Sequence, residues 1–114
     1  RFHCLEFSKV ELAPLAPVYD DILIDTLPYL GILVTNTLVA ADEILIPMEA
    51  EYLATQSVPV MLQHVAQVRK SGLNLGLAVT GILITKAART TISRQIIEYT
   101  RSEFEDQVRV FETV

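Results

Sequence analysis

The sequence predicts an α/β fold with three layers, in which a mostly parallel sheet is covered by helices on both faces. Short apolar runs rich in β-branched residues are bounded by Pro, Gly or Asp, as is typical of buried parallel strands. Segments with helical spacing of apolar residues separate these runs, and such alternation indicates βαβ units. The chain has 114 residues, and no linker or repeat interrupts them. It is therefore expected to form a single domain, residues 1–114.

Four segments are predicted to be strands. The first is the Ile-Leu-Ile run at 22–24, within residues 21–25. The second is 43–47, which Pro47 is expected to close because proline cannot continue a sheet ladder. The third is 77–85, and 108–111 is a candidate for the fourth. Residues 1–18 predict no regular element.

Three segments are predicted to be helices. Residues 32–41 follow Gly31, and a second helix has Pro59 in its first turn and stops at Gly72. The third runs from about 91 to 104. Its apolar side is expected to contain Ile92, Ile96, Ile97, Thr100 and Phe104. Its opposite, charged stripe contains Arg94, Glu98, Arg101 and Glu105.

Composition and charge exclude several kinds of function. The net charge is −5, so a whole-surface affinity for nucleic acid or anionic lipid is not expected, and any DNA contact needs a local basic patch. Cys4 is the single cysteine, which excludes an intramolecular disulfide and favours a cytoplasmic location. No apolar run reaches the roughly 18 residues of a membrane span. The start at Arg1 indicates a processed form, a fragment or an excised domain.

Asp25 is the candidate ligand-binding residue, because it directly follows the apolar run at 22–24. Ligands of open parallel sheets bind at the carboxyl ends of the strands. A carboxylate there can hold Mg²⁺, directly or through water, beside nucleotide phosphates, as in a Walker B motif. The pattern equally fits an aspartate that caps the next helix or stabilises a turn.

The wider context resembles the ParA/Soj family of chromosome- and plasmid-partitioning ATPases, relatives of MinD in the deviant Walker group. The family pattern runs from Tyr-Asp through an apolar strand to Asp-x-Pro-Pro-Ser-Leu-Gly, then Asn-Ala-Leu-x-Ala-Ala-Asp, a strand ending in Pro, and Glu-Tyr-x-Ala. The matching pieces here are Tyr19-Asp20, Ile22 to Asp25, Pro28, Leu30-Gly31, Asn36, Leu38, Ala40 to Asp42, Ile44 to Pro47 and Glu51 to Ala54. Downstream, residues 79–104 are similar to the family's Gly-x-x-x-Thr strand end and Arg-Thr-x-x-Ser-x-Gln helix start.

The resemblance implies a partial P-loop NTPase fold that binds ATP and Mg²⁺ between two subunits. It implies slow hydrolysis, non-specific DNA binding by the ATP dimer, and stimulation by a ParB-like partner at the nucleoid. Asp25 would be the catalytic and metal-binding carboxylate, and the loop with Thr26 and Pro28 would sense the γ-phosphate. Thr85 would lie near the adenine. The candidates for DNA contacts are Arg89, Arg94 and Arg101.

The sequence also departs from the family. No Gly-rich phosphate-binding loop is present: the four glycines are all more than three residues apart, and the lysines are Lys9, Lys70 and Lys86. The family's C-terminal base-holding segment is missing too. Leu27 and Tyr29 make the γ-phosphate loop bulkier. These 114 residues alone are therefore not expected to bind ATP. The alternative function is a non-enzymatic α/β interaction or dimerisation module.

In the family, the P-loop strand lies between the strands that correspond here to 21–25 and 43–47. Without it, these two strands are expected either to pair directly or to be completed by a second chain, because unpaired strand edges are sticky. A homodimer or a strand-swapped oligomer is therefore expected.

Two other groups of residues have simpler interpretations. His3, Cys4 and His64 do not have the spacing of a metal site and are expected to have ordinary surface or core roles. Residues 48–52, Met-Glu-Ala-Glu-Tyr, are expected to be a solvated loop rather than an acid–base pair. The apolar stripe within 58–68 is expected to pack on the sheet, with a partner surface as the alternative.

Overall fold

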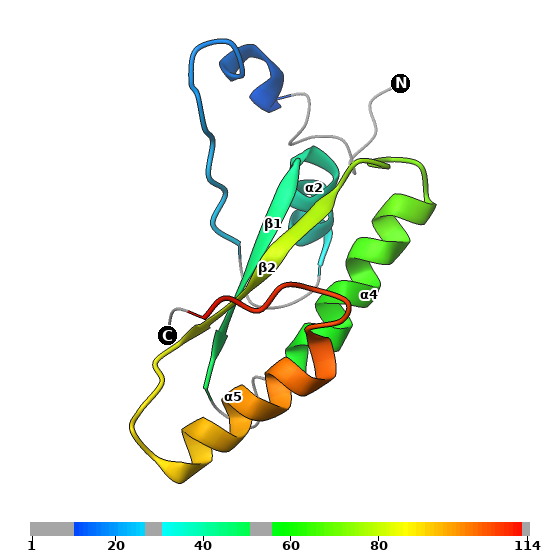
Figure 1. Ribbon diagram of the computed structural model, residues 1–114. Coiled ribbons are helices and arrows are strands. Elements are labelled where there is room, and N and C mark those ends of the chain that lie inside the picture. The colour runs from blue at the N-terminus through cyan, green and yellow to red at the C-terminus, as the bar shows by residue number, and fades with distance from the viewer. Residues whose placement is uncertain (1–10, 27–30, 51–55, 113–114) are drawn as a thin grey trace. The chain divides into compact units, whose positions relative to one another are not determined.

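The computed structural model describes residues 11–26, 31–50 and 56–112 of the chain. The elements are the 3₁₀-helix η2 (Ala13–Leu15), α2 (Ile32–Ala40), β1 (Glu43–Glu49), α4 (Ser57–Lys70), β2 (Ala78–Thr85) and α5 (Thr91–Phe104) (Figure 1). Two compact units share them. The first contains residues 1–42 and 64–77, and the second contains 43–63 and 78–114. A single domain over 1–114 remains a prediction.

The described sheet consists of β1 and β2, which are parallel. Glu43 pairs with Ala78 at one end and Glu49 with Thr85 at the other. The register shifts once, because Ile44 faces Val79 whereas Leu45 faces Gly81, so that Thr80 is an extra residue on β2. The two strands are joined through α4, as in a βαβ unit. The predicted α/β class with a parallel sheet and helices is therefore confirmed.

The prediction that Pro47 ends its strand is wrong. β1 continues to Glu49, and Pro47 lies opposite Leu83 in the register. Among the described residues β1 has a strand on one side only. A proline is tolerated in such a strand when its nitrogen faces away from the neighbour.

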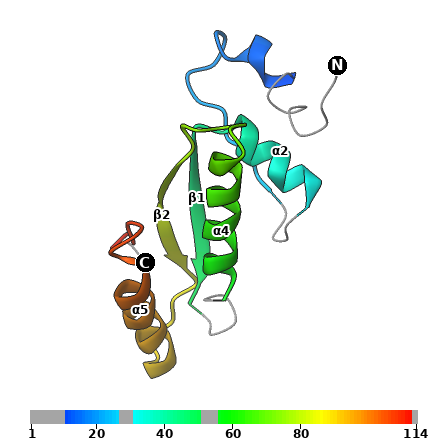
Figure 2. The same cartoon turned by 90° about the vertical axis from the view of Figure 1, so that its right-hand side faces the viewer.

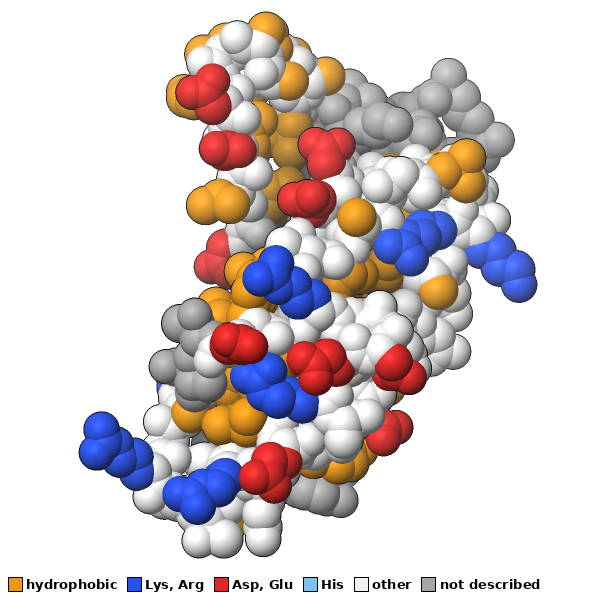
Figure 3. All heavy atoms as spheres, in the orientation of Figure 1, with side chains coloured by type: hydrophobic (Ala, Val, Ile, Leu, Met, Phe, Trp, Pro, Cys, Tyr) orange, Lys and Arg blue, Asp and Glu red, His pale blue; other side chains and the backbone are white. Residues whose placement is uncertain are grey.

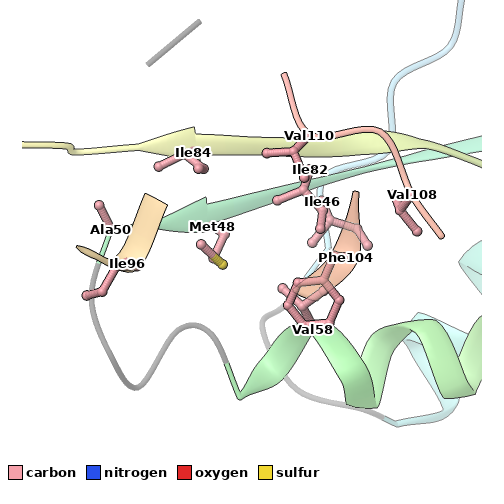
Figure 4. Close-up of a cluster of buried hydrophobic side chains, with 10 residues drawn as sticks. All are labelled: Ile46, Met48, Ala50, Val58, Ile82, Ile84, Ile96, Phe104, Val108 and Val110. Atoms are coloured by element: carbon pink, nitrogen blue, oxygen red, sulfur yellow. The ribbon is translucent and has the colours of Figure 1, made fainter. Parts of the chain in front are cut away.

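One face of the sheet carries the core of the second unit. Ile46 and Met48 of β1 and Ile82 and Ile84 of β2 alternate with more exposed residues, as the period of two requires. They pack with residues of α4, α5 and the C-terminal segment (Figure 4). The other members of this cluster are Ala50, Val58, Ile96, Phe104, Val108 and Val110. Full burial of each large apolar side chain contributes about 1.5–3 kcal/mol, so this cluster stabilises the second unit substantially.

Helix α5 has the predicted limits of 91 and 104. Its N-cap is Thr90, whose Oγ1 accepts a hydrogen bond from the Ser93 N–H at 3.1 Å. The helix begins beyond the carboxyl end of β2 and turns back toward the sheet (Figures 1 and 2). Its buried side contains Ile96, Thr100 and Phe104, but Ile92 is 66% exposed, so the placement of Ile92 on the apolar side is wrong. Ile92 lies in the first turn, at the far end of the helix from Phe104.

The predicted fourth strand at 108–111 is reduced to a single parallel bridge between Val110 and Ile82. The Ile82 N–H donates to the Arg109 carbonyl at 2.8 Å, and the Phe111 N–H donates to the Ile82 carbonyl at 2.9 Å. Arg101 of α5 also donates to the carbonyls of Val110 and Phe111. The segment thus lies beside β2, but two backbone bonds are too few for a strand.

Gly81 allows this close approach. A Cβ at Gly81 would lie 2.7 Å from Cε2 of Phe111 and 2.8 Å from the Arg109 carbonyl oxygen. Both contacts are shorter than van der Waals distance, and the second is to backbone. A side chain at position 81 therefore has to displace the C-terminal segment.

Gly81→Ala is accordingly expected to lower the free energy of unfolding by about 1–3 kcal/mol, the usual cost of overpacking. Urea unfolding followed by circular dichroism measures this change. Gly76→Ala is the matched control, because a Cβ at Gly76 meets nothing within 4 Å. Equal stability of the two variants would contradict the proposed packing of the C-terminal segment.

The first unit contains α2 and the second half of α4. Val34, Leu38 and Val39 of α2 are buried, as are Val65 and Val68 of α4. Asn74 closes the end of α2: its Nδ2 donates to the carbonyls of Leu38 at 2.9 Å and Ala41 at 2.6 Å. Beyond α4, Gly72 takes a φ of +82°, a left-handed conformation that suits glycine and ends the helix as predicted. The predicted helix at 32–41 is confirmed as α2.

The prediction of a buried strand at 21–25 is wrong for the described structure. Residues 21–26 have no regular secondary structure, and Leu23 is 96% exposed. A strand is stabilised by ladder bonds to a neighbour, and no described strand pairs with this segment. Direct pairing of 21–25 with 43–47 therefore does not occur among the described residues. Completion by a second chain remains a prediction.

Candidate functional site

The carboxyl ends of β1 and β2 form the edge at which parallel α/β sheets bind ligands. Glu49 ends β1 opposite Thr85, the last residue of β2. Just beyond the ladder, the Ala50 N–H donates to the Thr85 carbonyl at 3.0 Å. Thr85, the residue predicted to lie near the adenine, is partly exposed at this edge. Its position is thus compatible with contact to a ligand.

Lys86 is a residue of this edge that the sequence interpretation missed. It directly follows β2 with a φ of +52°, the one left-handed non-glycine residue in the described part of the chain. Its Nζ lies 2.6 Å from Oε1 of Glu49. Left-handed residues of this kind gather at ligand sites. No local sequence signal marks this pair, because the contact depends on the register that places the last residue of β1 beside the residue that follows β2.

The interpretation of residues 48–52 as a solvated loop is therefore wrong for Met48 and Glu49. Met48 is buried in the core, and Glu49 is the last residue of β1. Residues 51 and 52 lie outside the described part. The extension of β1 beyond Pro47 is the reason for the error.

Asp25 and Thr26 lie at the end of the exposed segment 21–26, in the first unit. Thr85, Lys86 and the candidate DNA-binding arginines lie in the second unit. Pro28 falls outside the described residues. The N-cap of α2 is Gly31, and no side chain caps it. The interpretation of Asp25 as the cap of the next helix is therefore wrong.

The Asp25 carboxylate is suited to be one ligand of a magnesium ion. It is exposed, and its oxygens are the donors that Mg²⁺ prefers. No group of three or more His, Cys, Asp or Glu that could hold a metal occurs among the described residues. Protein Mg²⁺ sites beside phosphates often use only one or two carboxylates and complete the shell with water and phosphate oxygens. Among the described residues Asp25 can thus serve as a single magnesium ligand.

His64 has the ordinary role that was expected. Its Nε2 lies 2.9 Å from Thr35 Oγ1, which joins α4 to α2 within the first unit. Its Nδ1 is buried and has no hydrogen-bond partner among the residues that the structure describes. His3 and Cys4 lie outside the described residues.

The three candidate DNA-binding arginines differ in their surroundings. Arg89, in the loop before α5, and Arg94, in its first turns, are both exposed. Arg101 is partly buried, donates to the carbonyl oxygens of Val110 at 3.5 Å and Phe111 at 3.2 Å, and lies 3.8 Å from Glu105. Arg101 therefore already has a structural role, whereas Arg89 and Arg94 are the accessible cations.

Among the described helices, none is long and apolar enough to cross a membrane.

Residues 5–79 match the profile of a family described as AAA domain. The chain is 44% identical over 98 residues to the chromosome partitioning protein ParA of Myxococcus xanthus, which covers 85% of this chain and 34% of that protein. It is 39% identical over 109 residues to the chromosome-partitioning ATPase Soj of Treponema pallidum, which covers 95% of this chain and 42% of that protein.

The fold of this chain is similar to that of a protein of known structure. Cobyrinic acid a,c-diamide synthase from Mycobacterium smegmatis, solved with bound ADP and magnesium, aligns with a TM-score of 0.82 and 31% identity. The alignment covers 92% of this chain and 43% of that chain. This chain therefore spans less than half the length of the relatives that it matches. On the profile match and on these identities over most of its residues, the chain belongs to the ParA/Soj family of partitioning ATPases.

Proposed function

We propose that the chain is the part of a ParA-type ATPase that carries the Walker B aspartate and a DNA-binding segment. In this proposal it acts in the segregation of a chromosome or plasmid, in the cytoplasm and at the nucleoid. The observation that carries the proposal is the 39% identity to Soj, which extends over 95% of the chain. The proposed partners are a second copy, non-specific DNA and a ParB-like protein that stimulates hydrolysis.

In the proposed nucleotide site, Asp25 holds Mg²⁺ directly or through a water molecule. Its exposed position leaves it free for this contact. The bound cation would neutralise charge on the phosphates of ATP. Thr26 and Pro28 are assigned to the γ-phosphate side, and Thr85 to the adenine side. Leu27 and Tyr29 are bulkier than the Pro and Ser of the family pattern at these positions.

The 114 residues contain no Gly-rich loop, so few backbone N–H groups are available to surround the phosphates. We propose that they do not bind ATP tightly without such a loop. The second candidate function, a non-enzymatic interaction module, is favoured by one observation: the apolar residues Ile22, Leu23 and Ile24 are exposed and are not part of a described sheet. Such a segment is suited to pairing with another strand.

A chimera tests the nucleotide site. In it, the matched part of this chain replaces the corresponding 98 residues of the Myxococcus xanthus protein, which supplies the rest of the fold. The chimera is expected to bind Mg²⁺–ATP in a calorimetric titration. Asp25→Ala is expected to weaken this binding about tenfold or more, because the metal-phosphate contact loses its charged ligand.

The 114-residue chain alone is the reference and is expected to show no micromolar affinity for ATP. Asp21→Ala, which removes another exposed carboxylate from the same unit, is the matched control and should leave the chimera's affinity unchanged. A folded chimera that binds no ATP would instead support the interaction module.

A further inference from the structure

The segment from Lys86 to Arg94 is a local basic patch in an acidic protein. It contains three Lys or Arg and no acidic residue, although the whole chain has a net charge of −5. More broadly, residues 52–97 contain five Lys or Arg and no Asp or Glu. Lys and Arg side chains are visible at the lower left of Figure 3, where the loop between β2 and α5 lies in Figure 1. The proposed DNA contacts in this segment are assigned to Arg89 and Arg94, which are both exposed.

Ser93 makes two hydrogen bonds to the loop before α5, and they hold the two neighbours of Arg89. Its Oγ accepts a bond from the Ala88 N–H at 3.3 Å, and its own N–H donates to Thr90 Oγ1 at 3.1 Å. Arg89 lies between Ala88 and Thr90, so the backbone is fixed on both sides of it. The arrangement is a variant of the capping box, because Thr90 and Ser93 each satisfy a backbone N–H near the start of the helix.

Both ends of this loop are attached to the second unit. Ala87 packs against its apolar cluster. At the other end, the Arg94 N–H donates to the Thr90 carbonyl at 3.1 Å, as the first turn of an α-helix requires. Ser93 is only 5% exposed, whereas Arg89 and Arg94 are exposed. Ser93 is therefore poorly placed to contact a ligand itself, but it fixes the backbone from which both arginines extend.

We propose that Ser93 is a positioning residue, which prepares Arg89 and Arg94 for contact with DNA phosphates by fixing the loop before α5. This inference rests on the proposed DNA-binding function and names the residue that places its two cations. A protein whose cations already lie in place loses less conformational entropy when it binds the phosphates of a duplex. Without the two bonds the segment still carries both charges, but the loop has to be ordered when DNA binds.

The test is a fluorescence anisotropy titration of the chimera with a labelled duplex, in the presence of Mg²⁺–ATP and at several salt concentrations. Ser93→Ala and Thr90→Ala each remove one of the two bonds, and each is expected to weaken DNA binding about three- to tenfold. The slope of the salt dependence is expected to stay the same, because both arginines still contact phosphates in the complex. Arg89→Ala is expected instead to make the slope less steep by about one.

Two matched variants separate positioning from other effects of substitution near the helix start. Thr90→Ser keeps the hydroxyl of the cap and is expected to keep the DNA affinity of the unmodified chimera. Thr91→Ala removes an exposed hydroxyl of the same turn that takes part in neither bond, and it should also leave this affinity unchanged. The affinity of the Ser93→Ala chimera for Mg²⁺–ATP is measured beside its DNA affinity and is expected not to change.

The possible results distinguish failure of the positioning role from failure of the DNA-binding function. Unchanged DNA affinity in Ser93→Ala, while Arg89→Ala/Arg94→Ala weakens binding, would overturn the positioning role alone. A parallel loss of ATP and DNA affinity in Ser93→Ala would show general damage to the fold and would overturn that role too. If Arg89→Ala/Arg94→Ala also leaves DNA affinity unchanged, the proposed DNA-binding function itself fails.

Discussion

Ile82→Ala is expected to lower the free energy of unfolding by about 3–5 kcal/mol, the upper part of the range for truncating a buried aliphatic side chain. Ile82 is fully buried at the middle of β2. It pairs with Ile46 of β1 on one side and bridges Val110 on the other. The loss of its side chain therefore leaves a cavity in the apolar cluster that β1, β2, α4, α5 and the C-terminal segment share.

Domains of this size are stable by only about 5–15 kcal/mol, so the variant is expected to be close to unfolding. Urea unfolding followed by circular dichroism measures the change. The control is Ile92→Ala, which removes the same atoms from a side chain that is 66% exposed and should cost less than about 0.5 kcal/mol. If both variants lost the same stability, the assignment of Ile82 to the core would be wrong.

The sequence predicted an element well when the residues that determine its limits lie within it or directly beside it. The limits of α5 follow from its own sequence, because Thr90 caps the helix and Ile96 and Phe104 provide its buried side. Gly72 similarly marks a left-handed residue just beyond α4. Each of these signals lies within a few residues of the feature that it determines.

The strands were harder to predict, because a strand depends on its neighbour. The apolar run at 22–24 has the composition of a buried strand, yet in the described structure it is exposed and unpaired. The run at 108–111 makes only one bridge. Pro47 looked like a strand end but lies within β1. In each case the sequence shows β propensity but not the availability of a partner.

The residues of the candidate site likewise differ in whether nearby or distant parts of the sequence determine their positions. Asp25 and Thr85 could be singled out because each follows an apolar run that the family resemblance also marks. The contact between Glu49 and Lys86 could not, since it depends on the register of two strands that are distant in sequence. The structural role of Arg101, which Arg89 and Arg94 do not share, could not be predicted either. It depends on the path of the chain after α5, where Arg101 donates to the carbonyls of Val110 and Phe111.

Arg89→Ala/Arg94→Ala is expected to weaken non-specific DNA binding by the ATP-bound chimera about tenfold or more at low salt. We propose that both exposed side chains contact phosphates, and each lost contact removes nearly one released counterion from the binding equilibrium. Arg89 lies in the loop before α5 and Arg94 in the first turns of the helix, so neither substitution removes core packing. Fluorescence anisotropy with a labelled duplex measures the change.

Lys70→Ala is the control for a general loss of positive charge. Lys70 is an exposed cation at the end of α4, outside the segment from 86 to 94. Its removal is expected to change the affinity less than about twofold, since it is not assigned a phosphate contact. An effect as large as that of Arg94→Ala alone would show that the whole surface, and not this segment, attracts DNA.

The central claim is that the chain carries the DNA-binding segment of a partitioning ATPase in an otherwise acidic protein. The most direct test is the salt dependence of the affinity of the ParA chimera, in the presence of Mg²⁺–ATP, for a duplex of random sequence. The logarithm of the association constant is predicted to fall linearly with the logarithm of salt concentration. Arg89→Ala/Arg94→Ala in the chimera is predicted to make this slope less steep by about 2, because two phosphate contacts are lost. No binding at low salt, or the same slope for both proteins, would contradict the claim.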